Sequence, residues 1–240
     1  MLTDSIDTKY GKITIPINDL YIRNSLLYSK IWEKHLCDFF EKNLKEGDIV
    51  LDVGAFVGTH SLVMSQCVGE TGKVHAFEPG PFYKLIDVNA YQNNKKNIIV
   101  HHKGLSDQES IMYIPTMKEE KYDEKKNWGA VYLRSDKTND TVDMDEVLVV
   151  TLDSLDINGP VKLIKIDTEG MELKVLHGAK NLITRDKPIL VVEINHQPGS
   201  EGYKNVVTYL DQTLEYILFG NFISNRMYRT CDYLFSPKVH

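Results

Sequence analysis

Glycine and acidic residues form a short loop that is suited to binding a small ligand. The loop follows the apolar run 48–53 and precedes a helical pattern at 61–68. Glycine has no Cβ, so the backbone can turn tightly and approach a ligand closely. Open α/β sheets bind ligands outside the carboxyl ends of their strands, where this loop should lie. The candidate binding residues of this one loop are Asp52, Gly54, Ala55, Gly58 and Thr59.

The residue types of the loop disfavour a phosphate ligand. Phe56 occupies the second glycine position of the dinucleotide pattern, where a pyrophosphate requires bare backbone. The triphosphate-binding P-loop pattern is absent from the sequence. Asp52 would repel a pyrophosphate but attract an ammonium group. S-adenosylmethionine carries an ammonium, a carboxylate and a sulfonium and no phosphate, so we expect the loop to bind this cofactor.

Two further segments supply candidates for the adenosine part of the cofactor. Glu78 ends the predicted strand 73–78, twenty residues after Gly58. An acid at that place accepts hydrogen bonds from ribose hydroxyls. Ser106 and Asp107 follow the next predicted strand and are candidates to accept from the exocyclic amine of adenine.

Polar side chains at the ends of two later strands are candidates for proton transfer. Asp167 ends one strand, and Glu193 and His196 end the other. A hydroxyl that accepts a methyl group must lose its proton, so a carboxylate or imidazole here is a candidate general base. We predict Asp167, Glu193 and His196 as the catalytic candidates. The same three residues are possible ligands of Mg²⁺, but no spacing requires a metal and none is predicted.

Lys165 offers a structural alternative at the same place. Period two puts it on one face of its strand with Leu163 and Asp167. If the two strands are neighbours, Lys165 can pair with Glu193, since a buried lysine needs an acidic partner.

The elements that position these residues alternate along the chain. Strands are expected at 48–53, 73–78, 97–103, 161–167 and 188–194. Helices are expected at 61–68, 81–94 and 171–183. Strands that alternate with helices imply crossover connections and a mostly parallel sheet covered on both faces. The predicted fold class is therefore α/β, a doubly wound Rossmann-like sheet.

The remaining segments are predicted to be additions to this core. Residues 25–44 read as one amphipathic helix, a lid or flank, and residues 108–151 as an insertion with a hairpin and a mobile loop around EEKYDEKK. EYILFGNF and RMYRTCDYLF read as two strands joined by a turn at FISN, which form an antiparallel edge. We expect one domain, divided into an N-terminal flank, a cofactor core and C-terminal strands at 1–45, 47–195 and 196–240.

The composition indicates which binding partners and which cellular compartment to expect. The chain has 240 residues and a net charge of -6, which disfavours nucleic acid as the partner. No apolar run is long enough to span a bilayer and no secretory signal is visible, so we expect a cytoplasmic protein. Three widely spaced cysteines form neither a disulfide framework nor a metal-ligand pattern.

Several motifs together resemble the FkbM family of S-adenosylmethionine-dependent methyltransferases. In the order of that family they are LDVGAFVGTHSL, HAFEPGPFYKLIDVNAYQNN, NWGA, VTLDSL, LIKIDTEGMELKVLHGA and ILVVEI, within residues 47–195. The loop departs from the family at Phe56, where the family has Asn. The resemblance implies a class I methyltransferase fold, with a mostly parallel seven-stranded sheet and one antiparallel strand. It also implies methyl transfer to oxygen, often of a sugar or polyketide hydroxyl.

We therefore expect an O-methyltransferase that acts on a hydroxyl of a sugar, glycan or other small molecule. An N/D-P-P-Y/F/W tetrapeptide, typical of amine methylation, is absent. A ribose 2′-O-methyltransferase acting on RNA is the alternative, because Lys165, Asp167 and Glu193 resemble a proton-handling site of that kind. A non-catalytic cofactor-binding protein is the second alternative.

Overall fold

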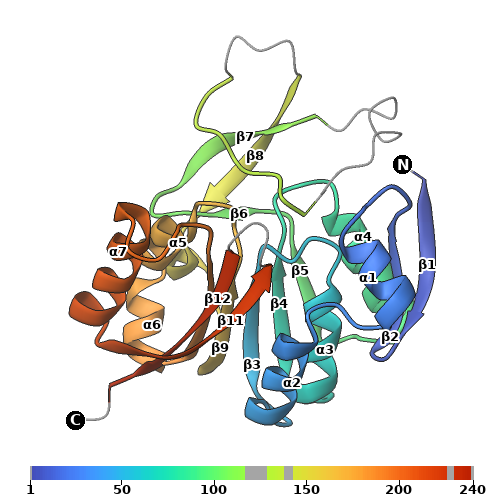
Figure 1. Cartoon of the computed structure of the whole chain (residues 1–240), viewed down its shortest axis with the longest axis horizontal. Helices are drawn as coiled ribbons and strands as arrows, with labels where there is room; N and C mark the ends of the chain where they lie inside the picture. Colours follow the sequence, from blue (N-terminus) through green and yellow to red (C-terminus); the bar gives the residue numbers. More distant parts are fainter. Residues whose placement is uncertain (1, 117–128, 138–142, 226–229, 239–240) are drawn as a thin grey trace.

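A mostly parallel sheet forms the centre of the molecule (Figure 1). The computed structural model describes residues 2–116, 129–137, 143–225 and 230–238. Within these residues the main sheet has seven strands in the order β11-β12-β10-β9-β3-β4-β5. Their bounds are β3 Ile49–Val53, β4 Lys73–Phe77, β5 Ile98–His101, β9 Val161–Ile166, β10 Ile189–Ile194, β11 Tyr216–Asn225 and β12 Thr230–Pro237.

One strand runs against the others. β12 pairs antiparallel with both β10 and β11, while β10, β9, β3, β4 and β5 pair parallel. Because β11 is antiparallel to β12, it runs in the same direction as the parallel strands. The predicted α/β class with one antiparallel strand next to the edge is confirmed.

Helices cover both faces of the sheet because successive strand residues point to opposite sides. Val50, Leu163 and Val191 pack with residues of α2 (Lys34–Asn43) and α3 (Thr59–Val68). Ile164 and Val192 pack on the other face with residues of the later helices. These are α5 Glu172–Gly178, α6 Lys180–Asp186, α7 Glu201–Thr208 and the π-helical turn Tyr209–Thr213. The helix α4 (Tyr83–Gln92) follows β4.

The N-terminal flank differs from the predicted single helix at 25–44. It contains a hairpin, β1 (Thr3–Thr8) and β2 (Gly11–Pro16), followed by α1 (Ile22–Ser29) and α2. The helix breaks because Lys30 and Glu33 both have left-handed backbones, with φ of 61° and 44°. The apolar spacing continues across this break, so the pattern alone did not reveal it.

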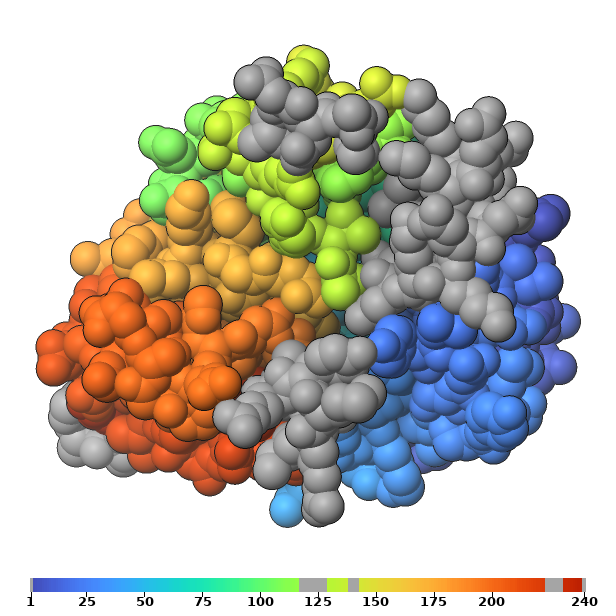
Figure 2. Space-filling model, turned by 45° about the horizontal axis from the view of Figure 1, so that its top comes forward, coloured from blue at the N-terminus to red at the C-terminus, as the bar shows by residue number. Residues whose placement is uncertain are grey.

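The insertion between β5 and β9 contains the predicted hairpin. β7 (Ser110–Pro115) and β8 (Met144–Val150) pair antiparallel, and β6 (Gly104–Leu105) joins them in a second sheet. A 3₁₀ turn at Leu152–Ser154 leads to β9. The predicted mobile loop at EEKYDEKK lies outside the described residues. In Figure 2 the insertion (lime) lies between the N-terminal flank (blue) and the C-terminal half (orange).

Two other boundaries were wrong. The predicted helix 171–183 is divided at Ala179 into α5 and α6. The predicted turn at FISN belongs to β11, and the connection to β12 at 226–229 lies outside the described residues. Helix α7 was not predicted. None of the helices in the described part of the chain combines the length and apolar character needed to cross a bilayer.

Candidate active site

Two adjoining cavities lie at the carboxyl ends of the parallel strands. The first is lined by Phe77 at the end of β4 and Glu78 after it, by Leu105 of β6, and by Val131 and Leu133 of the insertion, among others. The second is lined by residues of the glycine loop, the N-terminal flank and the ends of β9 and β10. The two cavities share Gly54, Phe56, Gly129, Asp167 and Glu169.

Gly54 holds the glycine loop close to the end of β9. Its φ is +81°, and an added Cβ would lie 1.7 Å from the carbonyl oxygen of Asp167. The amides of Gly54 and Ala55 both donate to the carbonyl of Phe77 at 3.0 Å. Two parallel strands are thereby joined at the floor of both cavities, and only glycine fits this position.

The rest of the loop forms the start of α3. Gly58, with φ of +81°, precedes Thr59, the first residue of the helix. Ala55 and Thr59 both line the second cavity. Phe56 has a left-handed backbone with φ of 50° and packs edge-on against Phe82, with 4.7 Å between the ring centroids. The phenylalanine that departs from the family pattern therefore keeps the backbone conformation of a glycine or asparagine.

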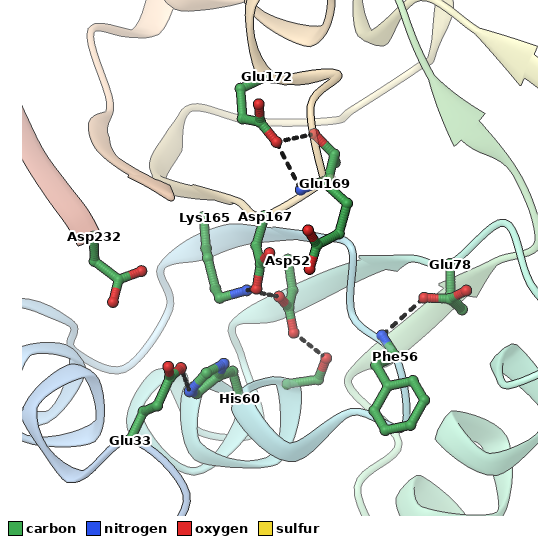
Figure 3. Close-up of polar contacts among 12 residues, drawn as sticks. Glu33, Asp52, Phe56, His60, Glu78, Lys165, Asp167, Glu169, Glu172 and Asp232 are labelled. Atoms are coloured by element: carbon green, nitrogen blue, oxygen red, sulfur yellow. Dashed lines mark hydrogen bonds and ion pairs between the residues drawn. The ribbon is translucent and has the colours of Figure 1, made fainter. Parts of the chain in front are cut away.

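Glu78 lies in the first cavity and is bonded to the glycine loop. Its carboxylate accepts a hydrogen bond from the amide of Phe56 at 2.9 Å (Figure 3). It also accepts one from the amide of Gly80 at 2.7 Å. Burial raises the pKa of Glu78 to about 8, although both amides oppose this effect. Glu78 therefore lies in a cavity at the ligand edge of the sheet, and it also holds the glycine loop through its hydrogen bond to Phe56.

Asp52 differs from its predicted place. It is completely buried beneath the loop and accepts a hydrogen bond from the hydroxyl of Ser61. The side chain lines neither of the two cavities. Its Oδ1 is 3.9 Å from Lys165 Nζ, which is 3.0 Å from Asp167 Oδ2 (Figure 3). The acid therefore supports the loop through a buried ion pair rather than facing a ligand.

The predicted pair between Lys165 and Glu193 is replaced by these contacts. Among the described residues, the ion pairs of Lys165 go to Asp52 and Asp167. Burial favours a neutral lysine, but Asp167 and Asp52 outweigh it and raise the pKa of Lys165. The ammonium group stays charged and is already neutralised by its partners.

Asp167 and Glu193 lie together in the second cavity. A carboxylate oxygen of one lies within 4.8 Å of a carboxylate oxygen of the other. Burial, then the charge of Asp167, raises the pKa of Glu193. Burial acts in the same direction on Asp167, but Lys165 outweighs it and lowers the pKa of Asp167. Of the two carboxyl groups, Glu193 is therefore the one whose protonated form is favoured.

Glu169 completes an acidic group at this edge of the sheet. Asn195 Nδ2 donates to its carboxylate at 2.9 Å, and burial raises the pKa of Glu169 to about 7. One carboxylate oxygen from each of Asp167, Glu169 and Glu193 lies within 4.8 Å of the others, a spacing that a cation can bridge. Glu172 instead turns inward and accepts from the amides of Thr168 and Gly170.

Besides Asp52, three further candidates from the sequence lie away from the two cavities. His196 is exposed and packs near Gly202 of α7, where an added Cβ would meet its ring at 2.4 Å. The hydroxyl of Ser106 donates to Asp107 at 3.0 Å, and neither residue lines a cavity. The same connection contributes Lys103 and Gly104 to the first cavity instead.

The N-terminal flank adds residues that the sequence reasoning missed. Trp32 and Glu33 line the second cavity with His60 of α3. The Nε2 atom of His60 is 3.4 Å from Glu33 Oε2. Burial holds the pKa of His60 well below its usual range, so the imidazole is neutral. His60 directly follows Thr59, so its place beside the glycine loop was the one available signal.

The chain matches known methyltransferases. Residues 52–234 match the methyltransferase FkbM domain family. The FkbM methyltransferase of Methylobacillus flagellatus is similar in structure, with a TM-score of 0.55, 18% identity, and coverage of 90% of this chain and 55% of that one. No curated protein matches the chain.

Two other solved structures share the fold at low identity. Aeropyrum pernix fibrillarin, which contains natively bound S-adenosylmethionine, has a TM-score of 0.52 and 16% identity over 85% of this chain and 74% of that one. Pyrococcus abyssi Trm5b has a TM-score of 0.57 and 13% identity over 98% and 55%.

The strand order, the single antiparallel strand and the cavities at the carboxyl strand ends define a class I methyltransferase that uses S-adenosylmethionine. The apolar first cavity with its acid suits an adenosine group, and Asp167 and Glu169 at the junction suit a cationic methionine group. The chain belongs to the FkbM methyltransferase family.

Proposed function

We propose that the protein transfers a methyl group from S-adenosylmethionine to a hydroxyl of a sugar, glycan or other small molecule. The observation that carries this proposal is the second cavity, which adjoins the cofactor cavity and contains two neighbouring carboxyl groups, Asp167 and Glu193. A hydroxyl acceptor needs a group that takes its proton, and these carboxyls are at the correct edge of the sheet.

The residues of the chain have distinct roles in this proposal. Glu78 accepts hydrogen bonds from the ribose, and the backbone of Gly54 and Ala55 contacts the methionine part. The cofactor supplies an activated methyl group, so positioning accounts for much of the rate. Asp167, ionised beside Lys165, takes the proton of the acceptor hydroxyl, and the carboxyl of Glu193 lies beside it in the same cavity.

RNA 2′-O-methylation is the second candidate function. Lys165, Asp167 and Glu193 do lie together, as that alternative requires. However, four acids and a single lysine line the second cavity among the described residues, and the chain has a net charge of -6. RNA would bring a phosphate backbone to this surface and would be repelled. The cavity therefore favours a small acceptor.

The test combines cofactor binding with turnover. We expect calorimetry to show binding of S-adenosylhomocysteine, and formation of this product from S-adenosylmethionine with compounds of a hydroxyl panel. The Asp167→Asn variant should bind the cofactor more weakly and, at saturating S-adenosylmethionine, lose about 100-fold in rate, a typical contribution of a general base. Methylation of RNA at low salt, with no turnover of any small hydroxyl compound, would contradict the proposal.

A further inference from the structure

The second cavity is rich in hydrogen-bond acceptors beyond the needs of the cofactor. Asp167 and Glu169 line both cavities, whereas Glu33, Glu193 and His60 line only the second. An ammonium and a sulfonium in the cofactor can be neutralised at the junction by the first two residues. Glu33 and Glu193 then remain for the acceptor, in a cavity of about 460 Å³.

Lys165, the lysine that lines this cavity among the described residues, does not neutralise the remaining acids. Lys165 is 2% exposed, and its ion pairs go to Asp167 and Asp52. Burial raises the pKa of both Glu33 and Glu193 because their charged forms lack a partner cation close enough to offset the loss of water. A cationic group entering the cavity would supply that partner.

Two buried atoms in the same cavity also lack a hydrogen bond. His60 is 5% exposed, and its Nε2 atom lies 3.4 Å from Glu33 Oε2 without forming a hydrogen bond to it. Asn195 Oδ1 is buried with no hydrogen-bond partner among the described residues, while its Nδ2 donates to Glu169. Buried polar groups are normally satisfied, so the Asn195 oxygen indicates a ligand with an N–H or O–H donor.

Aromatic side chains line the same cavity as these hydrogen-bond acceptors. Trp32 and Phe56 line the cavity together with Glu33. Aromatic rings beside carboxylates suit the apolar face of a sugar ring and the attraction of a cation to a π-system. A phosphate or carboxylate on the ligand would be repelled by the same acids.

We propose, on the basis of the proposed function, that the methyl acceptor is an amino sugar or another hydroxyl compound with a protonated amine. Glu33 and Glu193 bind the ammonium group, and the hydroxyl that is methylated lies toward Asp167. The methylated atom remains oxygen, since a protonated amine has no lone pair for attack on the methyl group. The amine determines which acceptor binds.

The test measures binding of matched sugars to the full-length protein saturated with S-adenosylhomocysteine. Glucosamine, glucose and glucuronate serve as probes in calorimetric titrations. We expect glucosamine to bind about tenfold more tightly than glucose, the gain typical of a hydrogen bond to a charged group, and glucuronate to bind more weakly than glucose. The ratio of glucosamine affinity to glucose affinity should fall to about one in the Glu33→Gln and Glu193→Gln variants.

Four results would overturn the inference. The first is binding of glucose that is equal to or tighter than that of glucosamine. The second is an unchanged preference for glucosamine in both variants. The third is displacement of glucosamine by Mg²⁺, which would assign the acids to a metal. The fourth is failure of glucosamine to bind in the millimolar range. S-adenosylhomocysteine binding, measured first, distinguishes each of these from failure of the methyltransferase assignment.

Discussion

The close approach of the glycine loop to β9 makes a quantitative prediction about Gly54→Ala. The new Cβ would lie 1.7 Å from the carbonyl oxygen and 2.8 Å from the carbonyl carbon of Asp167. Neither atom can rotate away, because both belong to the backbone. The chain would have to move by more than 1 Å, roughly the overlap of a normal carbon–oxygen contact.

The magnitude follows from what this movement disrupts. The amide of Asp167 donates to Val53 at 3.0 Å, and the amide of Gly54 donates to Phe77 at 3.0 Å. Loss of a buried hydrogen bond costs roughly 1–3 kcal/mol, and a left-handed alanine costs roughly 1–2 kcal/mol more. We expect the free energy of unfolding to fall by about 3–5 kcal/mol, a large fraction of a typical domain stability.

Gly170→Ala provides the matched control. Gly170 also has positive φ, at +102°, but an added Cβ meets nothing within 4 Å. This variant should lose only the conformational contribution, roughly 1–2 kcal/mol. Urea unfolding measures both changes, and calorimetry with S-adenosylhomocysteine should show weakened binding for Gly54→Ala only. Equal losses of stability in the two variants would refute the assignment of a clash at Gly54.

Three further changes test other parts of the site. Glu172→Ala leaves the amides of Thr168 and Gly170 without their acceptor, so urea unfolding should show that the free energy of unfolding falls by roughly 1–3 kcal/mol. The control is Glu70→Ala, at an exposed residue, where almost no change is expected. Phe56→Asn reduces the cost of the left-handed backbone at this position, roughly 1–2 kcal/mol, because asparagine tolerates this conformation better than phenylalanine. The substitution also removes the buried aromatic ring, which contributes roughly 1.5–3 kcal/mol, so we expect the free energy of unfolding to fall by about 1 kcal/mol. The pKa of Glu78 is raised from 4.5 to about 8, so the folded state holds its proton more tightly and this contribution to stability is lost as pH rises from 4.5 to 8. The fall in the free energy of unfolding over that window should therefore be smaller in Glu78→Gln, and an identical fall would show that Glu78 is not the group responsible.

The parallel core was predictable because its signals are local. An apolar run of five or six residues is interpreted as a buried strand when helical patterns separate it from the next run, as for 49–53 and 73–77. The place of Glu78 followed from the same logic, since a residue that ends a strand must lie at the ligand edge. Asp167 and Glu193 were brought together by strand order alone.

The remaining errors come from contacts that are distant in sequence. Asp52 reads as a ligand-binding acid until β9 places Lys165 beside it, more than a hundred residues later in the chain. His196 directly follows Asn195, but the backbone after β10 directs the asparagine toward the cavity and the histidine toward α7. Glu33 lies in a break between two helices, where the apolar pattern gave no signal.

The buried ion pairs of Lys165 also restrict how this sequence can change during evolution. Removing one partner from a buried pair typically costs 3–5 kcal/mol, about as much as many domains can lose, whereas replacing the whole group with apolar residues is often tolerated. Asp52, Lys165 and Asp167 should therefore be inherited together. Relatives that lack Lys165 should also lack Asp52, and a comparison of many homologous sequences should show covariation between these two positions.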